Sequence, residues 1–348
     1  MIRPGGSGRP ALLTDGSRRM TDLSLSNQTI AGKAAPPSEA RALRLPTQWL
    51  GVAPFFIFAI MFLILPTLYL MLGAFQNDAG EFTLENIIGI FDPPNLSNYL
   101  QCQINSWASW VDGNCSLPTI VAAYWISIKV SLASSLIGAF AGLAIAIAIV
   151  RGGLPEWIRS ATLTFSGVAS NFAGIPLAFA FLATLGRLGL ATVLLNTVFG
   201  LNIYAHGFNI LSFWGLTLTY VYFQIPLMVV IITPAIDGLK REWGEAAATL
   251  GATTAQYWRM VVIPVIWPSF LGTVILLFAN AFGAIATAYA LTGSSLNIIP
   301  IVLYAQIRGD VLHNAHLGYA IAFGMIVITG LANVFYIWFR TRSERWLK

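Results

Sequence analysis

Histidine and cysteine are the residue types here that could bind a metal or form a covalent link, and both are scarce. The three histidines are His206, His313 and His316, and the last two have an i, i+3 spacing that could share a metal ion. All three are predicted to lie outside the membrane, so we prefer the alternative of solvated loop side chains. Cys102 and Cys115 are predicted to face an oxidising compartment and to form a disulfide, with two unpaired thiols as the alternative.

ATP hydrolysis needs a phosphate-binding loop, and this sequence has none. The four lysines are Lys33, Lys129, Lys240 and Lys348, and none follows a Gly-x-x-x-x-Gly pattern. A membrane enzyme would need clustered His, Asp or Glu residues at one membrane face, and no such cluster is present. We therefore predict a chain that is not an enzyme and that binds neither a metal nor a cofactor itself.

Composition indicates that lipid is the main solvent of this chain. Of the 348 residues, 57% are hydrophobic and 9% are charged, with a mean hydropathy of +0.73. Soluble domains carry about 25% charged residues. The composition therefore excludes a soluble enzyme, a nucleic-acid-binding protein and a disordered chain.

Apolar runs long enough to cross a bilayer, about 20 residues each, predict an all-α integral membrane protein with six transmembrane helices. The first begins after a long tail and is too long for a cleavable signal peptide, so we expect it to be retained. The six predicted spans are Leu50–Ala74, Ala123–Val150, Ile158–Leu185, Phe208–Ile236, Val265–Thr292 and Leu317–Phe339.

The positive charges predict the orientation. With both termini in the cytoplasm, all 19 Lys and Arg residues except Lys129, Arg187 and Arg308 lie inside, as the positive-inside rule requires. The net charge of +5 is then a consequence of topology, and we predict no nucleic-acid partner.

These spans divide the chain into five parts. The loop after the first span holds five acidic residues and no Lys or Arg, which suits either a docking surface for an extracytoplasmic partner or a solvated connector. The parts are a disordered cytoplasmic tail (1–48), the first transmembrane helix (49–74), the extracytoplasmic loop (75–117), a core domain with five helices (118–340) and a cytoplasmic tail (341–348).

Polar residues inside the spans are candidates for a solute path, because polar groups in lipid need a partner or a wet cavity. They are Asn171, Tyr220, Gln224 and Asn280. An interhelical hydrogen bond is the alternative role for each. An ion-coupled secondary transporter is an alternative class, but such a protein needs buried ionisable groups for coupling. No Asp or Glu lies deep in any of these spans.

The cytoplasmic segment 237–264 predicts a helix–turn–helix outside the bilayer. Thr233-Pro234 has the pattern of a helix start, Gly251 that of a helix end, and Thr253 with Gln256 that of a capping box. Apolar residues fall on one face of the first helix, namely Leu239, Trp243, Ala246, Ala247 and Leu250. This pattern suits a hairpin that rests on lipid headgroups or one that docks onto a partner.

The same segment resembles the EAA loop of binding-protein-dependent ABC importer permeases. The resemblance is carried by Glu245-Ala246-Ala247, then three residues, Gly251, nine residues, and Val261-Val262-Ile263-Pro264. It covers residues 125–338 and implies the type I importer fold in a bacterial inner membrane. It also implies four partners besides lipid: two cytoplasmic ATPase subunits that bind ATP and Mg, a second permease subunit, and an extracytoplasmic substrate-binding protein.

The resemblance further implies roles for residues of this loop in coupling to the ATPase. Glu245 is the expected polar anchor, Ala246 and Ala247 allow close approach, and Gly251 makes the turn. Trp243, Tyr257, Arg259 and Pro264 complete the expected coupling site.

The flanking segments 222–228 and 233–237 look most similar to spermidine/putrescine-type permeases, which favours a polyamine-like solute. Permeases for iron, thiamine, phosphonates or sulfate stay open as alternatives.

Overall fold

The computed structural model describes residues 48–77, 79–92, 97, 118–293, 295–308 and 315–344. Within these ranges the regular elements are helices, together with one isolated antiparallel bridge between Gln76 and Phe82. The all-α transmembrane architecture predicted from composition is therefore confirmed. Most of the N-terminal tail, Cys102, Cys115 and His313 lie outside the described residues.

Contacts divide the chain into two units, residues 1–56 and 57–348. In the first unit the described residues form the start of α1 (Gln48–Ala59). The second unit continues through η1 (Ile60–Ile64) and α2 (Leu65–Gly73), and its remaining helices are α3 (Glu85–Phe91), α6 (Thr119–Arg151), α7 (Glu156–Asn171), α8 (Ile175–Leu185), α9 (Leu190–Phe199), α10 (Phe213–Asp237), α11 (Arg241–Thr249), α12 (Thr254–Tyr257), η2 (Trp258–Val262), α13 (Ile263–Phe282), α14 (Ile285–Thr292), α15 (Ile299–Arg308) and α16 (Ala315–Glu344).

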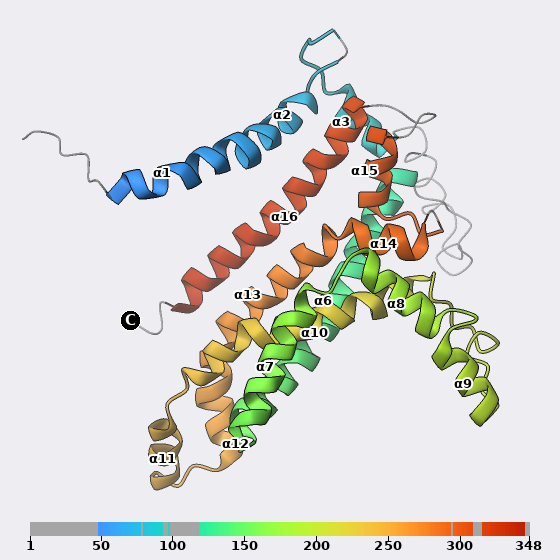
Figure 1. Cartoon of the computed structure of the whole chain (residues 1–348). Helices are drawn as coiled ribbons and strands as arrows, with labels where there is room; N and C mark the ends of the chain where they lie inside the picture. Colours follow the sequence, from blue (N-terminus) through green and yellow to red (C-terminus); the bar gives the residue numbers. More distant parts are fainter. Residues whose placement is uncertain are drawn as a thin grey trace, which may run out of the picture. The chain divides into compact units, whose positions relative to one another are not determined.

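Six helical stretches in the described residues are long and apolar enough to cross a membrane. They are Gly51–Gly73, Thr119–Arg151, Ile175–Phe199, Phe213–Asp237, Thr254–Phe282 and Ala315–Trp338. Within the second unit, α16 lies between α2 and α13 and contacts both (Figure 1).

The long helices α6 and α10 pack together through small residues. A Cβ atom added at Gly142 would lie 2.6 Å from the Cβ of Met228, and one added at Gly138 would lie 2.5 Å from the Cβ of Gln224. Any larger side chain must therefore push the two backbones apart. The Gly-x-x-x-Gly pair of α6 thus allows the close crossing that such motifs favour in membranes.

The prediction of one continuous helix over 158–185 is wrong. The chain leaves the helix after Asn171, passes through Gly174 with φ +78°, and restarts at Ile175 with Pro176 in the first turn. Glycine tolerates that left-handed angle, and a proline in the first turn removes an N–H that has no intrahelical partner there. Periodicity of apolar residues carries no information about such a break.

The fifth predicted span, 265–292, is also two helices. The first ends at Phe282 and the second begins at Ile285, with Ala284 in an extended conformation between them. Thr233-Pro234 is likewise no helix start, because α10 runs through Pro234 to Asp237 and the Thr233 hydroxyl donates to Val229 O at 2.6 Å. Within a packed membrane bundle, neighbouring helices support a helix that contains proline.

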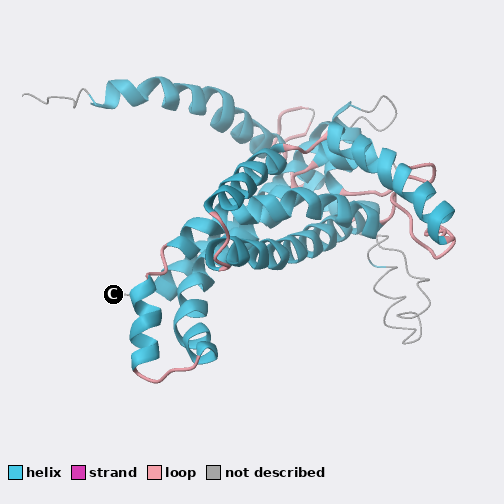
Figure 2. Ribbon diagram, turned by 60° about the horizontal axis from the view of Figure 1, so that its bottom comes forward, coloured by secondary structure: helices cyan, strands magenta, loops and turns pink. Residues whose placement is uncertain are grey.

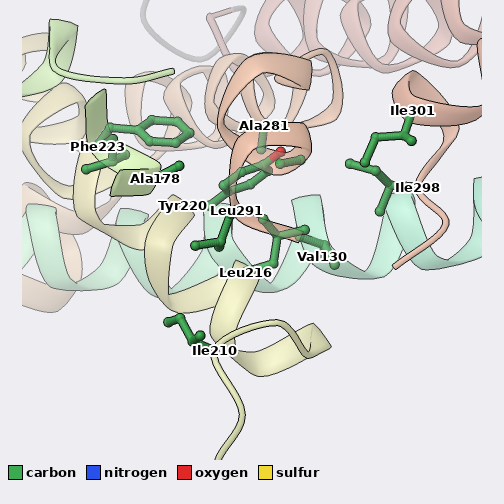
Figure 3. Packing of buried hydrophobic residues seen from close by; sticks show 12 residues of the cluster. Val130, Ala178, Ile210, Leu216, Tyr220, Phe223, Ala281, Leu291, Ile298 and Ile301 are labelled. Atoms are coloured by element: carbon green, nitrogen blue, oxygen red, sulfur yellow. The ribbon is translucent and has the colours of Figure 1, made fainter. Parts of the chain in front are cut away.

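Two of these helix breaks meet in the core. The Gly174 N–H donates to the Thr287 hydroxyl at 2.7 Å, which joins the start of α8 to α14. The Tyr220 hydroxyl donates to Ala284 O at 2.5 Å, at the break between α13 and α14. Figure 3 shows Tyr220 among Leu216, Ala281 and Leu291 in the buried cluster around this junction.

Candidate functional site

The segment that resembles the EAA loop forms a helical hairpin at one end of the second unit, where α11 and α12 are joined by a short turn (Figures 1 and 2). Gly251 follows α11 with φ +77°. Its N–H donates to Ala248 O and that of Ala252 donates to Ala247 O, each at 3.0 Å. These are the two hydrogen bonds of a Schellman motif, so the predicted helix end at Gly251 is confirmed.

The second helix begins with the predicted capping box. The Gln256 N–H donates to the Thr253 hydroxyl at 3.3 Å, and the Thr253 N–H donates to the Gln256 side chain at 2.7 Å. From there α12, η2 and α13 form one stretch from Thr254 to Phe282. Any displacement of α12 therefore acts directly on a membrane-spanning helix.

A turn of π-helix lies where this stretch meets Pro264. The Ile263 N–H donates to Trp258 O, an i→i−5 bond that precedes the proline. A proline ring clashes with the carbonyl four residues before it, and a wider turn relieves the clash. The first span has the same arrangement, with Leu65 donating to Ile60 O just before Pro66.

Two arginines bind the end of α10 and the linker that leads from it into the hairpin. Arg151, at the end of α6, donates from Nη2 to Leu239 O at 2.9 Å. Arg159, in α7, places its Nη2 atom 2.8 Å from both carboxylate oxygens of Asp237. The sequence predicts only that these arginines lie on the cytoplasmic side. It does not predict their partners, which lie more than 75 residues away in the chain.

Aromatic residues pack the second arm of the hairpin against the helix bundle. Tyr257 and Trp258 pack against a buried cluster that contains Leu239, Val262 and Ile266. Gly244 of α11 faces Tyr257, because a Cβ added there would lie 3.7 Å from Tyr257 Cζ. Leu239, which was predicted to share the apolar face of α11, instead precedes that helix and lies buried in the bundle.

The rest of that apolar face is uncovered. No residue of α11 is buried, and Ala247 is half-buried. Leu250 is 86% exposed and Trp243 is 39% exposed. Glu245, Ala246, Arg259 and Pro264 are exposed as well. Most of the residues predicted for coupling therefore lie in the hairpin, whereas Arg259 lies in η2 and Pro264 in α13. An apolar ridge formed by Trp243, Ala246, Ala247 and Leu250 lies on the surface of the hairpin.

Two residues predicted for the solute path are buried in the core. Besides the Tyr220 bond described above, Gln224 donates from Nε2 to Leu277 O at 2.9 Å and is fully buried. Its Oε1 atom has no hydrogen-bond partner among the described residues. Interhelical hydrogen bonds, the alternative that the sequence left open, describe both side chains in this structure. Asn171 and Asn280 are exposed.

A crevice that the sequence does not predict lies in the half of the second unit next to the hairpin. It has a volume of about 590 Å³ and lies between α10, α13 and α16. The polar residues that line it are Ser269, Thr273, Asn333 and Tyr336. Each has ordinary polarity for a helix surface and none interrupts an apolar run, so only the packing of three helices brings them together.

Fold and sequence agree on the class of protein to which this chain is similar. The chain has the fold of an ABC importer transmembrane subunit, and its sequence is similar to those of ABC importer permeases, as the EAA-like loop predicted. These relatives are transport subunits and not enzymes. Six apolar helices and such relatives indicate a multi-pass protein of a bacterial inner membrane. No protein-family model matches the chain.

Particular relatives carry different solutes. The sulfate transport system permease protein CysT of Salmonella typhimurium is 27% identical over 197 residues, which cover 56% of this chain and 67% of that protein. ModB of Mycobacterium bovis, a molybdenum transport system permease protein, is 26% identical over 54% of this chain and 69% of its own length. PotC of Escherichia coli, a spermidine/putrescine transport system permease protein, is 26% identical over 28% of this chain and 37% of its own length.

A solved structure supports the fold across most of the chain. A subunit of a bacterial ABC transporter involved in the import of alginate superposes with a TM-score of 0.59, covering 86% of this chain and 97% of that chain at 17% identity. A likeness at this identity establishes the arrangement of helices, and the solute has to be argued from the residues themselves.

Proposed function

We propose that this chain is the permease subunit of an ATP-driven, binding-protein-dependent importer that moves a small polar solute into the cytoplasm. The complex contains two ATPase subunits, one of which docks on the hairpin of this chain. A second permease subunit completes the path, and a binding protein delivers the solute from outside. Both termini and the hairpin lie in the cytoplasm. A polyamine-like solute is favoured, as the flanking segments suggest.

The observation that carries this proposal is the uncovered apolar ridge on a hairpin whose two arms lead directly into α10 and α13. Leu250 and Trp243 expose apolar surface beyond the helices that span the membrane. An exposed apolar patch with a polar rim is typical of a protein interface. Ala246 and Ala247 leave room for a partner backbone, and Glu245 supplies a carboxylate on the same helix.

The attachments of the hairpin suggest how docking drives the membrane helices. The first arm of the hairpin follows α10 after three residues, and the second arm is continuous with α13. Arg151 and Arg159 join the same segment to α6 and α7. A partner that moves the hairpin therefore moves four helices together, which would alternate the access to a path between these helices and the second permease subunit.

A bulky substitution on the apolar ridge tests this proposal. Ala247→Trp places a large ring where a partner must approach closely, whereas Ala247→Ser keeps the side chain small. We expect the tryptophan variant to lose co-purification of the ATPase and substrate-stimulated ATP hydrolysis, with an unchanged melting temperature because Ala247 lies outside the buried clusters. The serine variant should behave as the native chain does. Normal substrate-stimulated ATP hydrolysis by the tryptophan variant would contradict the proposal.

A further inference from the structure

We propose that an apolar groove between α6 and α13 binds one acyl chain of an anionic phospholipid, with the lipid headgroup at Arg151 and Arg259. The groove has a volume of about 190 Å³, and its lining residues are different from those of the crevice described above. This inference goes beyond the transport role proposed above, because it concerns a lipid and not the imported solute.

The groove is apolar along its whole wall. Its floor is formed by Val262, Ile266 and Phe270, which are all buried. At its edge, Ile263 is 51% exposed and Trp267 is 43% exposed. Among the described residues that line the groove, none has a charged, hydroxyl or amide side chain. A hydrocarbon chain therefore suits the groove, whereas a polar solute would lose its hydration there without gaining hydrogen bonds.

The groove lies within the leaflet on the hairpin side of the membrane. On α6 it is lined by Phe140, Leu143 and Ile147, whose spacing of three and four residues forms a line along one face of that helix. The helix ends at Arg151. At a rise of about 1.5 Å per residue, Phe140 lies about 16 Å from Arg151, which is about half the thickness of a hydrocarbon core. A chain in the groove would therefore run parallel to the other lipid tails of that leaflet.

An arginine lies just beyond the groove on each of its two walls. Arg151 follows Ile147 by four residues, and Ile147 lines the groove. On the other wall, Arg259 precedes Ile263 by four residues. Each arginine is therefore about one helical turn from a lining residue, on the hairpin side. Arg259 is exposed and forms no ion pair with a described residue. Arg151 uses Nη2 for Leu239 O, which leaves other N–H donors on its guanidinium.

The bond from Arg151 to Leu239 O holds this arginine next to the groove. Leu239 lies in the buried cluster that also contains Val262 and Ile266 of the groove floor. Trp258 packs against the same cluster and lines the groove near the start of the membrane-spanning stretch. Tryptophan is enriched at this depth, because its ring is apolar and its N–H is polar.

An anionic phospholipid matches both the groove and the two arginines. Its acyl chain fits the apolar wall, and arginine binds phosphate oxygens through charge-assisted hydrogen bonds. Basic pockets between membrane helices bind anionic lipid headgroups for this reason. A zwitterionic lipid also carries a phosphate, but its own cation would meet the same two positive charges. We therefore expect the anionic lipid to be preferred.

Photo-crosslinking of the full-length chain in lipid nanodiscs tests the proposal. Two probes carry the same diazirine-bearing acyl chain, one on a phosphatidylglycerol and the other on a phosphatidylcholine, and each is a minor component of phosphatidylcholine nanodiscs. Mass spectrometry identifies the labelled peptides. We expect the phosphatidylglycerol probe to label segments 140–147 and 258–270 in excess over the phosphatidylcholine probe. Unlabelled phosphatidylglycerol should compete, whereas inorganic phosphate should not, because it has no chain for the groove.

Two pairs of variants separate the headgroup from the chain. Arg259→Gln should lower the excess of phosphatidylglycerol labelling about fivefold, which is the contribution of one basic side chain to binding an anionic lipid. Arg241→Gln, at an exposed position at the start of α11, should leave the excess unchanged. Ile263→Trp fills the groove from its exposed edge and should lower labelling of the groove by both probes. Leu331→Trp, at an exposed position of α16, should not.

Three outcomes would overturn the lipid site: equal labelling of the groove by the two probes, equal effects of Arg259→Gln and Arg241→Gln, or no labelling of the groove by either probe. The first outcome would reduce the groove to an ordinary lipid contact. The last would mean that another protein surface, such as a second copy of the chain, covers it. The crosslinking needs neither ATPase nor solute, so its failure is distinct from a failure of the Ala247→Trp experiment.

Discussion

Gly251 offers a clean perturbation of the hairpin, because its replacement changes backbone conformation without adding a steric clash. Its φ is +77°, and a Cβ built there meets no atom within 4 Å. Any effect of a substitution therefore comes from the left-handed conformation itself. Gly251→Val adds a β-branched side chain that resists this conformation, whereas Gly251→Asn adds one that tolerates it.

The size of the effect follows from that conformational cost. A left-handed residue other than glycine costs about 1–2 kcal/mol, and more for a β-branched side chain. If the ATPase binds only the intact hairpin, this cost weakens the binding about 5- to 30-fold. Asparagine should lose only a small part of the affinity. The melting temperature of the membrane bundle should not change, because Gly251 contacts none of its buried clusters.

The assay is titration of the purified permease in nanodiscs with its cognate ATPase, with binding and ATP hydrolysis measured for both variants. The account predicts the order of affinity native chain, then Gly251→Asn, then Gly251→Val. Equal affinity of the valine and asparagine variants would refute the argument that the turn geometry positions the docking surface. A large fall in melting temperature would assign the loss to unfolding instead.

Four other substitutions have defined outcomes. Gly142→Ala should lower the free energy of unfolding by about 1–3 kcal/mol, because the added methyl group overpacks against α10. Gly167→Ala, with open space around it, should raise the free energy of unfolding by up to about 1 kcal/mol. Equal effects of the two substitutions in denaturant unfolding would argue against the close helix crossing. Tyr220→Phe should cost about 1–3 kcal/mol, because Ala284 O loses its buried donor, and an unchanged midpoint would contradict that bond. Arg159→Ala should cost less than about 1 kcal/mol, because its ion pair is partly exposed, and a larger loss would show a stronger attachment.

Composition and local patterns were enough to predict the number of spans, the positions of four of them and the hairpin, whereas the third and fifth spans lie at 175–199 and 254–282 and not at 158–185 and 265–292. Apolar runs report burial in lipid directly, and the Gly251 turn and the Thr253 capping box depend on residues close together in the sequence. The helix breaks at Gly174 and Ala284 were missed for the opposite reason. Both breaks lie inside continuous apolar runs, and they are held by bonds from Thr287 and Tyr220 that come from distant segments.

Proline was misread for a related reason. Near Pro234 the local pattern favours a helix start, yet α10 continues because its neighbours in the bundle support it. The crevice was missed because its polar residues belong to helices far apart in the sequence, with Ser269 and Asn333 separated by 64 positions. Such features depend on tertiary packing, which local patterns in a single sequence do not predict.

Purification of the tagged chain from its native membrane in mild detergent, with mass spectrometry of the proteins that accompany it, tests the central claim most directly. The account predicts that an ATPase accompanies the native chain and that a double variant with Glu245→Ala and Gly251→Val loses it while keeping the same melting temperature. A second permease in the native sample would distinguish a heterodimer from a homodimer. A native chain that binds no ATPase, or a double variant that retains it fully, would contradict the account.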